Sequence, residues 1–207
     1  MTSLSRRNLK PKNDGRKRYF DPRFQMVSVR VLPGEHYVTD DPDEMIVTVL
    51  GSCISACIRD PRTGLGGMNH FMLPSSDTGQ WGDVSAAMRY GNYAMEVLIN
   101  DLIRSGAPRE RLEVKIFGGS HIGTSKSDVG EKNIAFVRRY LKEEGFRAQA
   151  VDVGGFKPRR IHYFPADGKV KRLSLQQVEG VELRKQERDY STSISTTEVD
   201  GDIELFD

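Results

Sequence analysis

The chain has 207 residues, of which 37% are hydrophobic and 29% are charged. This length predicts one folded domain with tails, and the formal net charge of +2 gives no charge imbalance that would favour binding to nucleic acid. No stretch approaches the roughly 20 apolar residues of a membrane span, and the first residues contain no apolar signal core.

Residues 1–24 form a basic segment without apolar periodicity, which is typical of a disordered arm. One interpretation is a solvated tail. The other is attraction to an anionic membrane surface or to an acidic partner. The basic residues of the segment are Arg6, Arg7, Lys10, Lys12, Arg16, Lys17, Arg18 and Arg23.

Apolar and β-branched residues predict several strands in the first third of the chain. Met26–Leu32 alternates as a half-buried strand does, and Ile46–Leu50 is a continuous apolar run. A turn at Gly51-Ser52 separates this run from the next one, Ile54–Ile58, and a further turn precedes Met68–Leu73. We therefore expect strand, turn, strand, turn and strand between residues 46 and 73.

The two cysteines, Cys53 and Cys57, lie four residues apart. On a strand this separation is about 13 Å, which is too long for a disulfide bond. No further Cys or His stands at zinc-site spacing, so no metal site is predicted. Cys57 lies within an apolar run and is predicted to be a core thiol. Free thiols of this kind favour a reducing, cytoplasmic location.

A return of the chain after Ile54–Ile58 can bring His70 beside Cys53. A thiol held near an imidazole is the minimal nucleophile–base pair, because the thiolate attacks while the imidazole accepts and returns the proton. The alternative is that both residues are core residues, since free cysteine buries readily as a small hydrophobe. Spacing alone leaves both interpretations open.

Apolar residues at helical spacing predict two helices, Asp83–Ser105 and Gly130–Glu144. Between them lies a predicted strand, Leu112–Phe117, followed by Gly118-Gly119. A glycine pair after a strand is typical of close backbone approach, a phosphate cradle or an oxyanion site. His121 follows the pair and is either a rival to His70 as the base or a structural loop histidine.

The remaining predicted elements are a strand at Ala148–Val153 and a hairpin formed by Arg159–Pro165 and Val170–Leu175. Residues 177–207 lose apolar periodicity. From Asp189 onward they contain six acidic residues and no Lys or Arg. We expect a disordered acidic tail there.

The order of these elements indicates a mixed α/β or α+β layered domain. The motif T-x-L-G-S-C at 48–53, followed by G-G-M-N-H-F-M-L-P at 66–74, resembles the CheD family, the chemoreceptor glutamine deamidases of bacterial chemotaxis. The family pattern is LGSC followed seventeen residues later by the His of an HxMLP segment, and Cys53 and His70 are seventeen residues apart. The resemblance covers roughly residues 25–176 and implies a single domain with a three-layer α/β/β sandwich.

The resemblance also implies site residues. Cys53 corresponds to the nucleophile and His70 to the base of a hydrolase that converts glutamine to glutamate and ammonia. The family's third catalytic residue, a Thr, lies six residues before the Cys, whereas Thr48 lies five before it. Either the turn is one residue shorter here, or Thr48 is structural and Ser52 orients the imidazole. The N–H groups of Cys53 and of the Gly51-Ser52 turn are the expected oxyanion donors.

The partners implied by the resemblance are the cytoplasmic helices of methyl-accepting chemotaxis receptors, so that membrane contact is only indirect. A chemotaxis phosphatase is a further expected partner, and neither a metal ion nor an organic cofactor is expected. The rival function is a non-catalytic adaptor that binds receptors or such a phosphatase. A third interpretation, nucleic-acid binding through the basic arm, is supported by no motif. A monomer is the default expectation.

Overall fold

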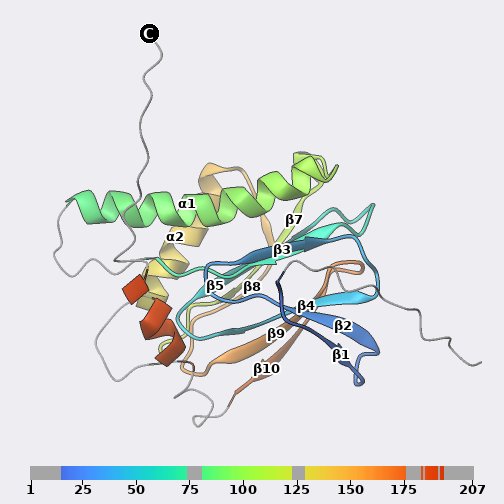
Figure 1. Ribbon diagram of the computed structural model, residues 1–207. Helices are drawn as coiled ribbons and strands as arrows, with labels where there is room; N and C mark the ends of the chain where they lie inside the picture. Colours follow the sequence, from blue (N-terminus) through green and yellow to red (C-terminus); the bar gives the residue numbers. More distant parts are fainter. Residues whose placement is uncertain are drawn as a thin grey trace, which may run out of the picture.

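The computed structural model describes residues 15–73, 81–122, 129–175, 183, 185–190 and 192–193, with the backbone alone at 81–86. These residues form three layers: two long helices, a five-stranded sheet beneath them, and a second five-stranded sheet beyond it (Figure 1). The arrangement confirms the predicted mixed α+β class. Each layer buries one apolar face against the next, which makes the fold an α/β/β sandwich.

The middle layer is a sheet with the strand order β3-β6-β5-β7-β8. Its strands are β3 (His36–Thr39), β6 (Gly66–Asn69), β5 (Ile54–Arg59), β7 (Glu113–Gly118) and β8 (Ala148–Val153). Only β7 and β8 pair in parallel, and the other described neighbours in this sheet pair antiparallel. Because β5 is the central strand, its first residues are flanked on both sides.

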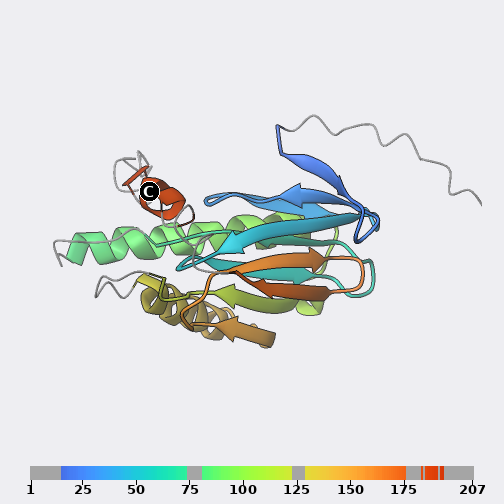
Figure 2. The same ribbon diagram turned by 90° about the horizontal axis from the view of Figure 1, so that it is seen from below.

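The outer layer is a sheet with the strand order β1-β2-β4-β9-β10. Its strands are β1 (Arg18–Asp21), β2 (Met26–Arg30), β4 (Glu44–Leu50), β9 (Arg159–Phe164) and β10 (Lys169–Ser174). Figure 2 shows the molecule from below, with this sheet in front of the first helix. The strand β4 is central here, so the chain passes from the centre of one sheet to the centre of the other within three residues.

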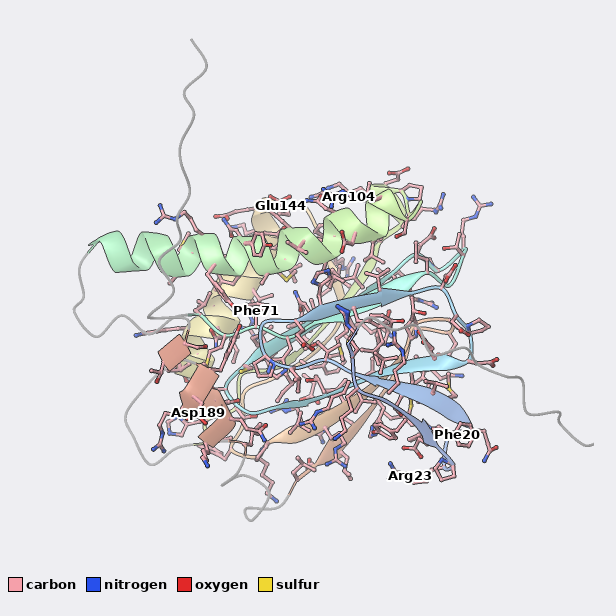
Figure 3. All side chains as sticks on the ribbon, in the orientation of Figure 1. Phe20, Arg23, Phe71, Arg104, Glu144 and Asp189 are labelled. Carbon is pink, nitrogen blue, oxygen red and sulfur yellow. The ribbon has the colours of Figure 1, made fainter. Side chains whose placement is uncertain are left out.

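The helical layer consists of α1 (Trp81–Arg104) and α2 (Val129–Glu143), and a 3-10 turn, Arg109–Arg111, lies between them in sequence. Both helices pack on the face of the middle sheet that carries Ile54 and Phe71. Phe71, labelled in Figure 3, lies beneath the helices with its ring 5.9 Å from that of Phe136 on α2. No helix in the described part of the chain is long and apolar enough to span a bilayer.

A second apolar core fills the space between the two sheets. Side chains alternate along a strand, so a strand that borders this space contributes alternate residues to it. The buried residues of this inter-sheet core include Val29, Ile46, Leu50, Cys53, Cys57, Met68, Met72, Phe117, Ile161 and Tyr163. Both cysteines are free thiols within this core.

Most predicted elements are present with boundaries shifted by two residues or fewer. The predicted strand Met68–Leu73 differs, because β6 ends at Asn69 and the chain beyond it makes only an isolated bridge to Ile54. Two strands, β1 and β3, were not predicted. Both have four residues, which is too short for alternation to be a clear signal. Tertiary pairing with β2 and β6 decides their conformation.

The described residues also differ from the predicted tails. Residues 1–14 lie outside the described residues, but β1 falls inside the predicted arm and pairs with β2 along its full length. Residues 185–190, inside the predicted acidic tail, are helical, and Glu187 among them is buried. In both places, contacts with distant parts of the chain stabilise structure that local composition does not indicate.

Candidate active site

The segment Gly51-Ser52-Cys53 crosses from one sheet to the other. Leu50 ends β4 in the outer sheet and Ile54 begins β5 in the middle sheet. The crossing needs a tight turn, which the glycine and serine supply. The Cys53 side chain is fully buried at the end of this crossing.

Cys53 and His70 point to the same side of the middle sheet. Ile54 and Phe71 form a bridge between β5 and the segment after β6, and both pack against the helices. Cys53 and His70 each precede one member of this pair, so alternation turns both toward the outer sheet. They are diagonal neighbours across two antiparallel segments, a relation in which residues lie about 7–8 Å apart and long side chains can meet.

Thr48 reaches His70 from the facing sheet. Its hydroxyl donates to the carbonyl oxygen of Val31 at 2.8 Å and lies 2.8 Å from Nδ1 of His70. Because the hydroxyl proton is used by Val31, the Thr48 oxygen accepts a hydrogen bond from the Nδ1–H group. This fixes the imidazole tautomer with the lone pair on Nε2. That Nε2 atom is buried and has no hydrogen-bond partner within the described part of the chain.

The crossing between sheets explains the five-residue spacing of Thr48 and Cys53. On one continuous strand, residues five apart would face opposite sides. Here the chain leaves β4 and joins the facing sheet, so both side chains point into the inter-sheet core. Ser52, the alternative orienter, donates instead to Glu187 at 2.6 Å. The structure thus brings Thr48 rather than Ser52 against the imidazole, and the catalytic role of Thr48 stays a prediction.

A carboxylate that sequence analysis did not single out occupies the turn beside Cys53. Oε1 of Glu187 accepts hydrogen bonds from the N–H groups of Gly51 at 3.1 Å and Ser52 at 3.0 Å. The thiol and backbone N–H of Cys53 interact with the same carboxylate. Only 6% of Glu187 is exposed. The contact spans more than 130 residues of sequence, so no local pattern could have predicted it.

Burial keeps the thiol and the imidazole neutral in this arrangement. Desolvation raises the pKa of the Cys53 thiol, and the charge of Glu187 raises it further. Desolvation also lowers the pKa of His70 to about 3, with a smaller contribution from the charge of Arg30. The pKa of Glu187 is raised by burial, although the hydrogen bond from Ser52 opposes this effect. A preformed thiolate–imidazolium pair is therefore disfavoured while Glu187 is in place.

Two glycines permit the close approaches that this site needs. A Cβ atom at Gly51 would lie 2.6 Å from Oε1 of Glu187. Gly118 has a φ of +116° and packs directly against the carbonyl of Cys53. The next N–H group, of Gly119, donates to that same carbonyl at 2.7 Å. The predicted glycine pair thus lies against the Gly51-Ser52-Cys53 turn and supports its backbone.

Asn133 of α2 also braces the turn. Its side-chain amide donates to the carbonyl of Ser52 at 2.8 Å and accepts from the N–H group of Leu73 at 2.9 Å. Asn133 is completely buried. It therefore ties the segment before Cys53 to the segment after His70. The sequence carried one signal of this role, a polar residue within the buried stripe of a helix.

Arg159 holds together the two loops beside the turn. It donates to the side chains of Asp152, at 2.6 Å, and Ser120, at 2.8 Å, and also contacts the carbonyl of Gly154. The N–H group of Ser120 in turn donates to the carbonyl of Gly51 at 2.6 Å. The buried guanidinium thus holds the loop at Gly118-Gly119-Ser120 against the Gly51-Ser52-Cys53 turn.

The other candidate residues lie in different environments. His121 is exposed, and its ring packs edge-on against Phe156 with centroids 6.1 Å apart. Cys57 is buried in the inter-sheet core, as predicted, and burial raises its pKa. Among the residues that the structure describes, no group of three His, Cys, Asp or Glu side chains could hold a metal ion.

Comparisons with known proteins agree with the resemblance. The CheD family model, described as CheD chemotactic sensory transduction, matches residues 72–173. A protein of Rhodopseudomonas palustris (strain BisA53) is 50% identical over 93% of this chain and 91% of its own length. A protein of Herminiimonas arsenicoxydans is 52% identical over 91% of this chain and 93% of its own length.

A third relative, from Hahella chejuensis (strain KCTC 2396), is 52% identical over 86% of this chain and 84% of its own length. All three relatives carry the name "Probable chemoreceptor glutamine deamidase CheD". The family-model match begins after Cys53 and His70, whereas these relatives match most of the chain. This chain therefore belongs to the CheD family.

Proposed function

We propose that this protein hydrolyses the side-chain amide of glutamine residues in chemoreceptors, giving glutamate and ammonia. Its relatives are named for this activity. The observation that carries the proposal is the environment of His70. Its Nδ1 is bonded to Thr48, its buried Nε2 has no partner among the described residues, and it shares the inter-sheet face with Cys53. A base that activates a thiol needs an oriented ring with one nitrogen available.

In the first half of the reaction, the Cys53 sulfur attacks the amide carbon of the substrate glutamine. The thiol proton passes to Nε2 of His70 as the carbon–sulfur bond forms, because burial disfavours a thiolate formed in advance. The resulting imidazolium then donates this proton to the amide nitrogen. The carbon–nitrogen bond breaks, ammonia leaves, and a thioester to Cys53 remains.

In the second half, water attacks the thioester carbon while Nε2 of His70 accepts one of its protons. The carbon–sulfur bond breaks, the proton returns to the sulfur, and the product is a glutamate side chain. Thr48 acts through His70 in both halves. It holds the Nδ1–H group, so that Nε2 remains the atom that accepts and donates the proton.

The tetrahedral intermediate of each half carries a negative oxygen that needs hydrogen-bond donors. The N–H groups of Gly51, Ser52 and Cys53 supply them, since these groups already hold a carboxylate oxygen in the structure. One such donor contributes about 2.7–4 kcal/mol to transition-state stabilisation in a well-studied protease.

The test is incubation of a purified chemoreceptor cytoplasmic fragment with the full chain, followed by mass spectrometry of its glutamines and an ammonia assay. We expect the wild-type chain and Cys57→Ala to convert glutamine to glutamate. We expect Cys53→Ala to release no ammonia, because the attacking atom is gone. Cys57→Ala is the matched control, since it removes the other buried thiol. Deamidation of the fragment by Cys53→Ala would contradict the proposal.

The remaining expectations from the sequence stay predictions. These are the catalytic roles of Cys53, His70 and Thr48, a chemotaxis phosphatase as a second partner, a monomeric state and a cytoplasmic location. A chain that acts only as an adaptor would leave the receptor fragment unchanged in mass while still binding it. The experiment above therefore separates the two functions.

A further inference from the structure

The hydrogen bonds to Glu187 show that the Gly51-Ser52 turn binds the polar end of a side chain. Two backbone N–H groups and the Ser52 hydroxyl all donate to its carboxylate, and the Cys53 thiol adjoins it. A turn whose N–H and hydroxyl groups all donate toward one point binds an acceptor oxygen there, such as that of a carboxylate or a carboxamide. Glutamate is also the product of the reaction proposed above. Glu187 therefore places in the turn the same carboxylate group that the product carries.

Glu187 belongs to a C-terminal segment, residues 183–193, in which residues 184 and 191 are not described. Leu183, Glu187 and Tyr190 are spaced by four and three residues, so they lie on one face of a helix. Leu183 and Glu187 are buried, whereas 185, 186, 188 and 189 are exposed. The described residues of the segment therefore dock through one face.

The docked face meets two further parts of the domain. The hydroxyl of Tyr190 contacts that of Tyr90 on α1. A Cβ atom at Gly34 would lie 2.8 Å from the Tyr190 hydroxyl, so the segment also packs on the turn between β2 and β3. Figure 1 and Figure 2 both place the segment at the end of the molecule where α1 begins, and Figure 3 shows Asp189 on it.

We propose that the C-terminal segment is an intramolecular pseudosubstrate, in which Glu187 occupies the position of the substrate's glutamine side chain and blocks Cys53 until the segment leaves. The proposal rests on the proposed function, since it identifies the occupied turn as the site of glutamine hydrolysis. It adds that the chain carries its own competitor for this site.

Occupation by Glu187 inhibits in two ways. It covers the thiol, which has no exposed surface in the structure. It also places a carboxylate where a neutral carboxamide must bind, and its charge opposes formation of the thiolate. A segment joined covalently to the domain has an effective concentration of about millimolar, so a receptor competes against a locally abundant ligand. The apparent affinity for substrate falls with the fraction of open molecules.

The direct test converts the pseudosubstrate into a substrate. In full-length Glu187→Gln, the introduced carboxamide lies beside Cys53. We expect it to be hydrolysed, with one water consumed and one ammonia released, so that the purified variant carries a carboxylate at position 187 again. The double variant Glu187→Gln/Cys53→Ala should retain the carboxamide at this position. Peptide mass spectrometry of both proteins measures this difference.

A second measurement reports on access to the thiol. We expect iodoacetamide to alkylate Cys53 about tenfold faster or more in Glu187→Ala than in the wild-type chain, because the anchoring hydrogen bonds and the opposing charge are lost. Asp189→Asn is the matched control, since it removes an exposed carboxylate from the same segment. This control should react at the wild-type rate.

The outcomes separate this inference from the proposed function. If Glu187→Gln deamidates a receptor fragment but keeps its own carboxamide at position 187, the pseudosubstrate assignment is overturned and the deamidase proposal stands. If it deamidates neither glutamine while the wild-type chain deamidates the fragment, only the pseudosubstrate assignment is overturned. If the wild-type chain also leaves the fragment unchanged, both proposals fail. Equal alkylation rates in Glu187→Ala and in the wild-type chain would also overturn the inference, because the segment would then not control access to Cys53.

Discussion

Replacing Thr48 by Val tests whether the imidazole of His70 is oriented from the facing sheet. Valine has nearly the same shape as threonine but lacks the hydroxyl. In the structure this hydroxyl satisfies two buried groups, the carbonyl of Val31 and the Nδ1–H group of His70. The substitution therefore removes both hydrogen bonds of the hydroxyl while the packing changes little, and the His70 ring keeps its interaction with the backbone of Val31.

The expected effects follow from these two contacts. A buried polar group left without a partner costs about 1–3 kcal/mol, and because the His70 ring still interacts with the backbone of Val31, Thr48→Val should lower the free energy of unfolding by about 1–3 kcal/mol in total. Loss of an orienting hydrogen bond worth about 1.4 kcal/mol should lower kcat about tenfold. The KM for the receptor fragment should change little, since Thr48 is buried and does not line the surface.

The assay combines urea unfolding with deamidation kinetics on a chemoreceptor fragment, measured where the variant is fully folded. Thr48→Ser is the control, because it keeps the hydroxyl and should retain most of the activity. A kcat for Thr48→Val equal to that of Thr48→Ser, together with the expected loss of stability, would refute the reasoning. Thr48 would then be a structural residue that happens to contact His70.

Two further predictions concern stability. Asn133→Ala should lower the free energy of unfolding by about 2 kcal/mol, because the partly buried N–H group of Leu73 and the carbonyl of Ser52 both lose this hydrogen bond; urea unfolding measures this, and an unchanged midpoint would contradict it. The pair of buried Asp60 with Arg111 lowers the pKa of the Asp60 carboxyl to about 2. The stability that this pair contributes is complete above the unfolded pKa of about 4 and is lost as the pH falls toward 2. Thermal unfolding should therefore show a shallower loss of stability between about pH 4 and 2 in Asp60→Asn than in the wild-type chain, and parallel curves would contradict the assignment.

Local pattern was sufficient for most of the secondary structure. The apolar run before Gly51 and the one after Ser52 form β4 and β5, and the helical spacing in the middle of the chain forms α1. Each of these signals lies within a dozen or so neighbouring residues, and burial of one face is enough to select the conformation. Strand β1 shows the limit of this reasoning. Two of its four residues are exposed, and its pairing with β2 is what makes it a strand.

The site was predicted only in part. The spacing of Cys53 and His70, with the family resemblance, identified the two residues as a candidate pair, and their catalytic roles stay a prediction. The orientation of Thr48 could not be derived from spacing, because counting residues assumes one continuous strand. Asn133 and Arg159 contact the turn and its loops from other elements, and Glu187 does so from the far end of the chain.

The sequence by itself determined the class of the fold, the glycine-containing segments Gly51-Ser52 and Gly118-Gly119, and the residue types able to do thiol chemistry. Each of these depends on neighbouring residues. Only the tertiary structure decided which side chains meet in the space between the sheets. That decision arises where β4 crosses to β5 and turns Thr48 and Cys53 into the same core. It arises again where Glu187 contacts the Gly51-Ser52 turn from the far end of the chain. The first event depends on how the two sheets pack and the second is a long-range contact, so neighbouring residues alone specify neither.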